Sequence, residues 1–217
     1  MLKAMIAALS AGLLAAACTN PFKADPGVAP GAVATDATSA TSHGWTARWD
    51  TKAEGAAWTA LHDHGAALVA STPGDIDAYC PTYREAGVSA RTAFWVGLMS
   101  TLAKYESNYD PTVKFTEPFA DSTGQPVVSR GLLQISRESA NGYGCGIGNA
   151  EELHDPQTNL SCAVRILNKL VVRDGVIAAK VGTKWQGASA YWSPFRRADS
   201  LADMKSWVGA QDYCAKT

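Results

Sequence analysis

A glutamate at the end of a predicted helix is the residue whose type and position best suit chemistry. The helix is predicted from Ser89 to Ser107, and its apolar stripe is formed by residues four apart, Phe94, Leu98 and Leu102. Glu106 continues that stripe, so its carboxyl should lie at the rim of the core, where desolvation raises its pKa. A carboxyl that keeps its proton near neutral pH can act as a general acid on a glycosidic oxygen. Periodicity alone still favours an exposed glutamate, because the phase of a stripe drifts over four turns.

Four short motifs favour a catalytic Glu106 over an exposed one. They are AKYESNYDP at residues 103–111, GLLQI at 131–135, DPQTNL at 155–160 and AYW at 190–192. In this order they resemble the soluble lytic transglycosylase (SLT) domain of the lysozyme-like superfamily, in which a helix ends in Glu-Ser and Gly-Leu-Met-Gln, Asp-Pro…Asn-Ile and Ala-Tyr-Asn segments follow. Each motif is weak alone, but four in the right order over roughly 100 residues are fairly specific.

The resemblance implies an enzyme, a peptidoglycan lytic transglycosylase, with one catalytic acid/base at Glu106. The family cleaves the β-1,4 bond between N-acetylmuramic acid and N-acetylglucosamine and leaves 1,6-anhydromuramyl ends. Gln134 matches the motif glutamine that lines the substrate cleft, and Tyr191 matches the tyrosine whose hydroxyl lies near the catalytic glutamate. Ser107 matches a serine whose role is to support the end of the helix. The expected substrate is therefore the glycan strand of peptidoglycan.

The chain departs from the family pattern between the first two motifs. Glu106 and Gln134 are 28 positions apart (134 − 106), which is more than the usual spacing. The extra segment, Phe115–Val128, is expected to be a long loop that acts as a lid over the sugar. Ser129 and Ser122 are both candidates for the serine that the family places in this interval. Trp192 replaces the usual asparagine of the last motif.

Two other functions stay open. Goose-type lysozymes share the fold and carry acidic residues before the same Gly-Leu-Met-Gln motif, so Asp121 is a candidate base that activates water across the cleft. The reaction would then be hydrolysis, with inversion if the two carboxyls were about 6.5–9.5 Å apart. A solvated loop acid is the plainer interpretation of Asp121. The third possibility is a non-catalytic glycan-binding module of an envelope complex.

The N-terminus predicts export. Lys3 is the only charged residue before Cys18, and an apolar run ends in small residues before that cysteine. This order is typical of a signal peptide over residues 1–17, and it resembles a bacterial lipobox that would place a lipid on Cys18. An ordinary secretory signal with a chance cysteine is the alternative. Residues 18–44 are rich in Ala, Thr, Pro, Gly and Ser and are expected to be a flexible tether. The expected location is the periplasm, anchored to the outer membrane.

The cysteine count agrees with export. Without Cys18, four of the five cysteines remain, an even number that suits an oxidising compartment. We favour Cys145–Cys162, which closes a short loop, and Cys80–Cys214, which ties the start of the domain to its end. A zinc site made of four cysteines is the competing interpretation, but the chain has no C-x-x-C pair.

The elements around these residues are predicted to be helical. Helices are expected at Lys52–Ala70, at Pro156–Arg173 with Asp155 as its N-cap, and at Leu201–Val208; Ser89 is the expected N-cap of the helix that ends near Glu106. Strand signals are weak. The expected fold is therefore all-α, a lysozyme-like helical domain over residues 45–217 with long loops and two disulfides.

Composition excludes some partners. The formal net charge of −1 gives no strong attraction to nucleic acid. His62 and His64 lie on different sides of a helix, so no metal site is expected, nor any cofactor. Trp185, Trp192 and Phe195 are expected to pack in the core rather than stack on sugars. The expected partners are peptidoglycan and, through the lipid, a membrane; recruitment by an envelope or secretion complex is left open.

Overall fold

The computed structural model describes residues 50–215 of the 217-residue chain. The predicted signal peptide, Cys18 and the tether lie outside these residues, as does the start of the expected domain, residues 45–49. The described α-helices are α1 Thr51–His64, α2 Ala66–Ala70, α3 Val88–Glu106, α4 Arg137–Gly142, α5 Pro156–Asp174 and α6 Ala198–Gly209. The strands are β1 Lys114–Ala120, β2 Pro126–Arg130, β3 Ile135–Ser136, β4 Ala178–Val181 and β5 Lys184–Gly187. The fold is mostly helical, as expected, but it is not all-α.

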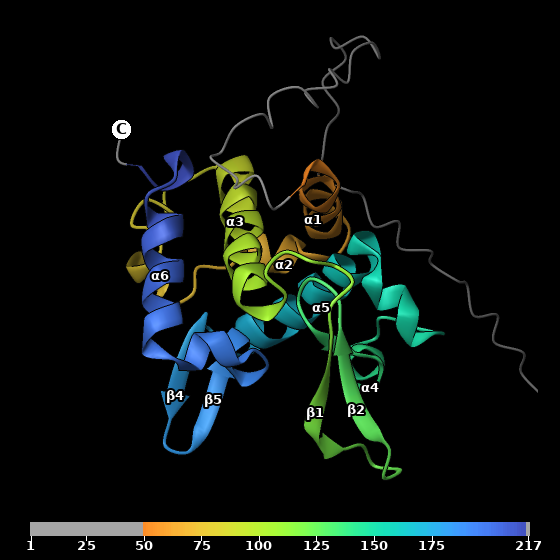
Figure 1. Ribbon diagram of the computed structural model, residues 1–217. Coiled ribbons are helices and arrows are strands. Elements are labelled where there is room, and N and C mark those ends of the chain that lie inside the picture. The colour runs from red at the N-terminus through yellow and green to blue at the C-terminus, as the bar shows by residue number, and fades with distance from the viewer. Residues whose placement is uncertain (1–49, 216–217) are drawn as a thin grey trace, which may run out of the picture. The chain divides into compact units, whose positions relative to one another are not determined.

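Helix α3 runs through the middle of the helical layer, between α1 and α6 (Figure 1). Its residues from Thr92 to Ala103 are all buried, so the helix has no polar face over most of its length. A helix that is apolar all round belongs inside a core. The stripe of Phe94, Leu98 and Leu102 is therefore part of a fully buried cylinder, and Glu106 lies at the rim because the helix leaves the core there.

Two helix boundaries differ from the sequence-based expectation. The predicted helix 52–70 is two helices, because α1 ends at Gly65, whose N–H donates to Leu61 O at 2.9 Å before α2 begins. Helix α3 begins one residue before Ser89, after Gly87, and no side chain caps it, so Ser89 is not the N-cap. An extended glycine can precede a helix without a side-chain cap at a modest cost in stability.

Helix α5 follows its sequence signals closely. The Asp155 carboxyl accepts a hydrogen bond from Thr158 N at 3.0 Å, and Pro156 occupies the first turn. Gly175 ends the helix in a left-handed conformation with φ 67°. Helix α6 spans 12 residues and includes the predicted segment Leu201–Val208.

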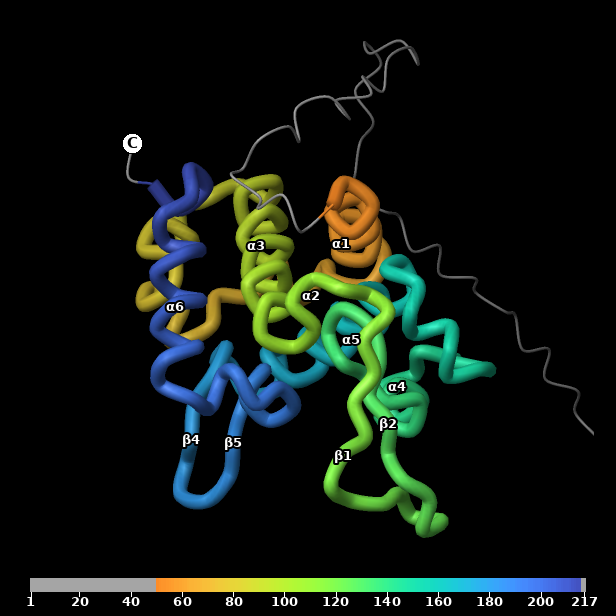
Figure 2. Tube along the Cα trace, viewed as in Figure 1, coloured from red at the N-terminus to blue at the C-terminus, as the bar shows by residue number. Residues whose placement is uncertain are grey.

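The five strands correct the expectation of long loops. Strands β1, β2 and β3 form an antiparallel sheet in that order, and β4 pairs with β5 in a second hairpin. The segment expected to be a loop, Phe115–Val128, lies almost wholly in the β1–β2 hairpin. Strand β1 is exposed at nearly every position, so it has none of the alternation by which a half-buried strand is recognised. Both hairpins project from the same end of the domain, on either side of the C-terminal end of α3 (Figures 1 and 2).

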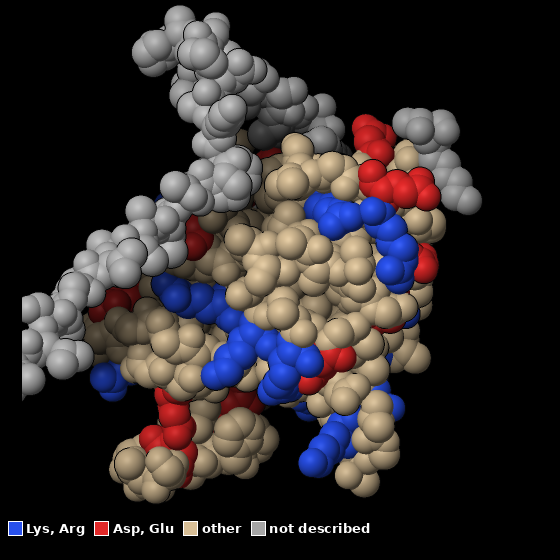
Figure 3. All heavy atoms as spheres, turned by 180° about the vertical axis from the view of Figure 1, so that it is seen from behind, with Lys and Arg blue, Asp and Glu red and all other residues tan. Residues whose placement is uncertain are grey.

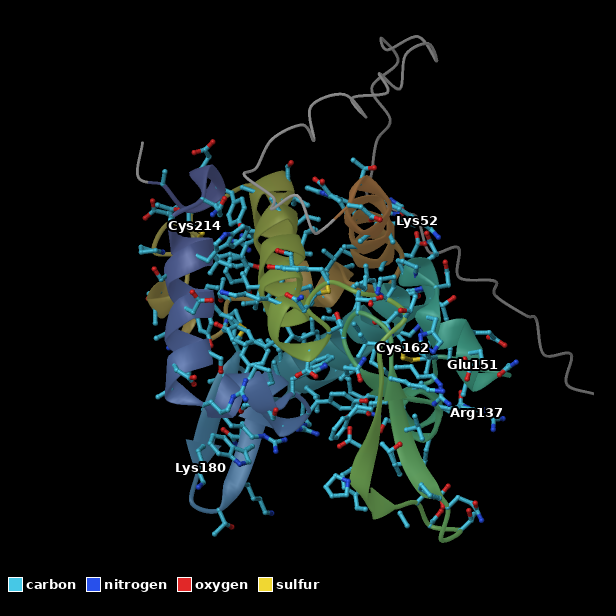
Figure 4. All side chains as sticks on the ribbon, viewed as in Figure 1. Lys52, Arg137, Glu151, Cys162, Lys180 and Cys214 are labelled. Carbon is cyan, nitrogen blue, oxygen red and sulfur yellow. A yellow bond between two sulfur atoms is a disulfide. The ribbon has the colours of Figure 1, made fainter. Side chains whose placement is uncertain are left out.

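Both predicted disulfides are confirmed. Cys80–Cys214 joins residues whose Cα atoms are 5.0 Å apart, and Cys145–Cys162 joins Cα atoms 5.3 Å apart (Figure 4). The first bond connects the region before α3 to the end of the domain, and the second fixes the segment after α4 to α5. Across residues 50–215, no group of three His, Cys, Asp or Glu side chains could hold a metal ion. None of the helices described is long and apolar enough to cross a membrane.

Candidate active site

Glu106 is the last residue of α3, at the point where the helix emerges from the core. Ser107 caps the helix, and Asn108 and Tyr109 then adopt positive φ angles of 50° and 67°, which turn the chain away. The buried Ser107 hydroxyl donates to Leu132 O at 2.9 Å and so ties this end of the helix to the second motif. The position of Glu106 is therefore fixed by the turn that follows the helix and by the hydrogen bond from Ser107 to the second motif.

The Glu106 side chain faces a cavity of about 300 Å³. One wall comes from the β1–β2 hairpin, another from β3 and α4, and a third from the segment after β5. The lining residues are Glu106, Glu117, Phe119, Val127, Ser129, Gln134, Ser136, Ser139, Tyr191, Trp192, Ser193 and Arg196. The cavity therefore contains four sequence-predicted site residues, Glu106, Ser129, Gln134 and Tyr191.

The environment of Glu106 suits an acid that keeps its proton. Burial raises the pKa of its carboxyl to about 7, and the nearby Glu117 carboxylate adds to the rise. Arg197 and Arg196 oppose it, because a positive charge favours the ionised form. Near neutral pH, Glu106 can therefore both donate and accept a proton, which is the property that a general acid and base needs.

The Gly131–Gln134 turn is held by side chains from the other motifs. The fully buried Asn159 donates through Nδ2 to Arg130 O at 3.0 Å and accepts from Leu133 N at 3.0 Å. The buried Trp192 donates from Nε1 to Leu133 O at 2.9 Å. The four motifs that are dispersed over the sequence thus meet at one turn.

Gly131 has no room for a side chain in this turn. Its φ is 76°, and a Cβ atom would lie within van der Waals overlap of Leu153 O and of the Asn159 amide. Only glycine adopts this conformation without a steric penalty and also fits that space. The glycine of the second motif is therefore explained by packing.

Gln134 is strained and mostly buried. Its φ is 44°, and its Nε2 donates to Gly131 O at 2.8 Å and to Val113 O at 3.0 Å. Its Oε1 atom is buried and has no hydrogen-bond partner in the described structure. A strained residue with an unsatisfied acceptor at a cavity wall is the kind of feature that a bound ligand can satisfy.

Tyr191 lines the same cavity as Glu106. Burial raises the pKa of its phenol to about 12, while hydrogen bonds with the Ser139 side chain and the Ser136 backbone lower it. The Glu106 carboxylate also raises the pKa of this phenol, which places the two groups within electrostatic reach of each other. The Tyr191 ring packs edge-on against Trp192, with centroids 4.7 Å apart.

Glu117 is the site residue that sequence reasoning passed over. It lies on β1, and its Oε1 accepts a hydrogen bond of 2.7 Å from the buried Ser129 hydroxyl on β2. Among the two serine candidates, Ser129 therefore lies in the cavity and Ser122 does not. The usable signal was residue type, because Glu117 and Asp121 are the two acids of the segment that the family lacks.

Asp121, the residue expected to activate water, lies outside this cavity. It lines a separate hollow of about 440 Å³, together with Ser122 and Arg137. Its exposed carboxylate accepts hydrogen bonds from Thr123 N at 2.8 Å, Thr123 Oγ1 at 2.7 Å and Gln125 N at 2.9 Å, and these bonds lower its pKa. Asp121 shapes the turn of the β1–β2 hairpin and does not face Glu106.

Of the three aromatic residues expected to pack in the core, two do so. Trp192 and Phe195 are buried. Trp185 on β5 is only partly buried, and it carries two cations on its ring: Lys180 Nζ lies 4.9 Å from the ring centroid and the Arg196 guanidinium 5.9 Å. These contacts connect the β4–β5 hairpin to the cavity wall at Arg196.

The two hairpins differ in charge. Seen from behind, acidic atoms gather on the β1–β2 hairpin at the lower left and basic atoms on the β4–β5 hairpin at the lower right (Figure 3). Between Lys114 and Arg130 at its ends, the first hairpin carries Glu117 and Asp121. The second carries Lys180 (Figure 4) and Lys184. The end of α3, at Glu106, lies between these two hairpins (Figure 1).

Comparisons with known proteins agree with the geometry. The family model of the transglycosylase SLT domain matches residues 87–202. The solved structure named Bd0314 DslA wild-type form 2 is 41% identical, with a TM-score of 0.72, over 75% of this chain and 91% of that chain. Two DslA variants are also similar. In one, the glutamate at position 154 of that chain is replaced by glutamine (40% identity, TM-score 0.72, 75% and 91% covered). In the other, the glutamate at position 143 is replaced (39%, 0.73, 77% and 96%). No curated protein matches.

Proposed function

Because the chain belongs to the transglycosylase SLT domain family, we propose that it is a peptidoglycan lytic transglycosylase in which Glu106 moves the protons. The family acts on peptidoglycan glycan strands. The observation that carries the proposal is the Glu106 carboxyl itself, which has a pKa of about 7 in a cavity that also holds Gln134 and Tyr191. A group with this pKa is present in both protonation states near neutral pH.

In the first step, the protonated Glu106 donates to the oxygen that links N-acetylmuramic acid to N-acetylglucosamine. The bond between the muramyl anomeric carbon and that oxygen breaks, and positive charge develops on the sugar ring. The Glu106 and Glu117 carboxyls are the acidic groups that line the cavity, so negative charge is available near the developing cation.

In the second step, the Glu106 carboxylate takes the proton of the muramyl C6 hydroxyl. The C6 oxygen bonds to the anomeric carbon and closes a 1,6-anhydro ring. The proton taken from the hydroxyl leaves Glu106 in its protonated form, so the acid is restored and no water is consumed. One carboxyl with a pKa near the working pH can perform both transfers.

The test is digestion of purified sacculi by wild type and by Glu106→Gln, followed in gels and by mass spectrometry of the released muropeptides. We expect wild type to clear the gel and to release anhydro ends, and Glu106→Gln to lose at least a thousandfold in rate. Glu85→Gln, at an exposed position away from the cavity, is the matched control. Equal clearing by wild type and Glu106→Gln would remove Glu106 as the acid. Failure of the wild type to clear would favour a glycan-binding module.

A hydrolytic reaction is a second candidate, and Glu117 rather than Asp121 is the residue that favours it. The glutamates replaced in the two DslA variants are 11 positions apart (154 − 143), and Glu106 and Glu117 are also 11 apart (117 − 106). If Glu117 activates water as a base, the water oxygen bonds to the anomeric carbon and the product has a reducing end. Reducing ends from wild type, lost in Glu117→Gln, would establish hydrolysis; anhydro ends would exclude it.

We further propose that the chain is a lipoprotein of the periplasm, anchored to the outer membrane through Cys18. The apolar run before Cys18 and the small residues that end it support this proposal. The mass of the mature N-terminus should show a lipid-modified cysteine, and Cys18→Ala should release the protein from the membrane fraction. A membrane-free wild-type protein that begins elsewhere would contradict the anchor.

A further inference from the structure

The β1–β2 hairpin contains an irregularity beside the cavity. Thr116 pairs with Val128 and Ala120 with Pro126, so the three residues 117–119 of β1 face Val127 alone. Strand β1 is also the edge of its sheet, and Pro118 removes a backbone donor within the irregular stretch. Bulges re-aim side chains next to active sites. Here both Glu117 and Phe119 line the Glu106 cavity.

The same hairpin exposes two large aromatic rings. Phe119 is 59% exposed and Phe115 is 57% exposed. Phe115 pairs across the strands with Ser129, which lines the cavity. Directly paired residues of antiparallel strands project to the same face of the sheet, so Phe115 lies on the cavity side of the hairpin. The face therefore presents phenyl rings at both ends of a carboxylate, in the order Phe115, Glu117, Phe119.

The size of the cavity requires binding surfaces outside it. A volume of about 300 Å³ is at the lower limit for pockets that enclose a small molecule, so it accommodates little more than one sugar ring. A glycan strand that is cut in its interior must continue beyond the cavity on at least one side. Phe119 lines this cavity and is also largely open to solvent, so it connects the cavity to the exposed face of the hairpin.

We propose that the hairpin face of Phe119 and Phe115 is a saccharide-binding platform, with Phe119 stacked on a sugar of the glycan next to Glu106. Pyranose rings present a face of C–H groups that packs on an aromatic ring, while Glu117 accepts hydrogen bonds from the polar edge. This extends the proposed function by naming the residues that hold the strand. The continuity of Phe119 with the cavity favours a glycan over a protein partner, since the substrate of the cavity already reaches it.

The test measures binding without catalysis. Binding is measured for Glu106→Gln protein with and without Phe119→Ala. One assay measures binding to purified sacculi, and a separate titration uses chitohexaose, a soluble glycan of the same β-1,4 linkage. Phe119→Trp keeps an aromatic face, and Phe115→Ala probes the second ring. Val181→Ala is the matched control, because Val181 is 60% exposed on the other hairpin. Thermal unfolding checks that each variant is folded, and sedimentation shows whether the protein is a monomer.

We expect Phe119→Ala to weaken binding about tenfold, Phe115→Ala about threefold, and Phe119→Trp and Val181→Ala less than twofold. In an otherwise wild-type chain, Phe119→Ala should raise KM and leave kcat nearly unchanged. Binding that Phe119→Ala does not change would overturn the platform and leave the proposed function intact. A Glu106→Gln protein that binds neither ligand would overturn both. A dimer that Phe119→Ala dissociates would show that the rings form an interface between copies.

Discussion

The two β-hairpins of this domain have similar positions at one end of the molecule and opposite properties. The β4–β5 hairpin is regular, with four successive pairs from Ala178–Gly187 to Val181–Lys184, and it is basic. The β1–β2 hairpin is irregular, carries Glu117 and Asp121 away from its two basic ends, and exposes Phe115 and Phe119. Only the irregular hairpin contributes its own residues to the Glu106 cavity. Glu117 and Phe119, two residues apart on β1, both line that cavity, and they lie within the irregular stretch.

The regular hairpin acts through the segment that follows it. Gly187, at the end of β5, has φ 61°, and a Cβ atom there would overlap Val176 O and Ile177 O. This turn directs the chain into residues 188–196, which carry Tyr191 and Arg196 to the cavity. Glu106 therefore experiences one neighbour that raises its pKa, Glu117, and two that lower it, Arg197 and Arg196. The difference between the two sides can be tested one charge at a time.

Replacement of Glu117 should have the largest effect on activity. Glu117→Gln removes a charge that raises the pKa of Glu106, so the alkaline limb of kcat/KM should move to lower pH. At pH 5.5, where Glu106 stays protonated in both proteins, any remaining loss reports a role in the reaction itself. We expect a loss of about tenfold to a hundredfold at pH 7. Glu138→Gln, outside the cavity, is the control, and an unchanged pH profile in Glu117→Gln would contradict the coupling.

Replacement of the acid should stabilise the protein in a pH-dependent way. The pKa of Glu106 is raised from 4.5 to about 7 in the folded state, so its stabilising effect is complete below pH 4.5 and is lost as pH rises through 7. Glu106→Gln does not ionise, so its stability does not fall in this way. The difference in free energy of unfolding between Glu106→Gln and wild type should therefore be roughly 2–3 kcal/mol larger at pH 8 than at pH 5. Urea unfolding at the two pH values measures this, and parallel pH dependences of the two proteins would contradict a buried acid.

Replacement of Arg197 should move the pKa of Glu106 in the opposite direction. Arg197→Met removes a charge that lowers the pKa of Glu106, so the alkaline limb should move to higher pH. We expect activity at pH 8 to rise about twofold at low ionic strength and the effect to fade in salt, because exposed charges are screened. Arg84→Met, in an ion pair with Asp77 elsewhere, is the control. A shift to lower pH would show that Arg197 acts on something other than the acid.

The smallest effect is expected at the tip of the β1–β2 hairpin. Asp121→Asn should leave activity within about twofold of wild type, because Asp121 shapes a turn and does not line the cavity. Its melting temperature should fall by no more than a few degrees. Activity on sacculi and thermal unfolding are the measurements. A loss as large as that of Glu117→Gln would return Asp121 to the candidate bases.

Much of the framework was predictable from local signals. The cap at Asp155 and the stop at Gly175 depend on neighbouring residues, so the sequence alone determined them. The even number of cysteines predicted two disulfides and favoured one pairing, and the tertiary structure decided that pairing. Glu106 could be named because a motif marked it, although its stripe could not show that α3 is buried on all sides. The candidate residues Gln134 and Tyr191 were identified in the same way.

Only the tertiary structure decided which acid accompanies Glu106. Strand β1 is exposed on both faces, so no hydrophobic alternation marks it as a strand and nothing local shows which of its side chains turn inward. Glu117 and Asp121 are both acids of one segment. They differ because Glu117 lies on β1 and accepts a hydrogen bond from Ser129 on the partner strand, whereas Asp121 lies past the end of β1 and accepts its hydrogen bonds from the turn. A carboxyl's surroundings, and therefore its chemistry, follow from those contacts and not from its own sequence position.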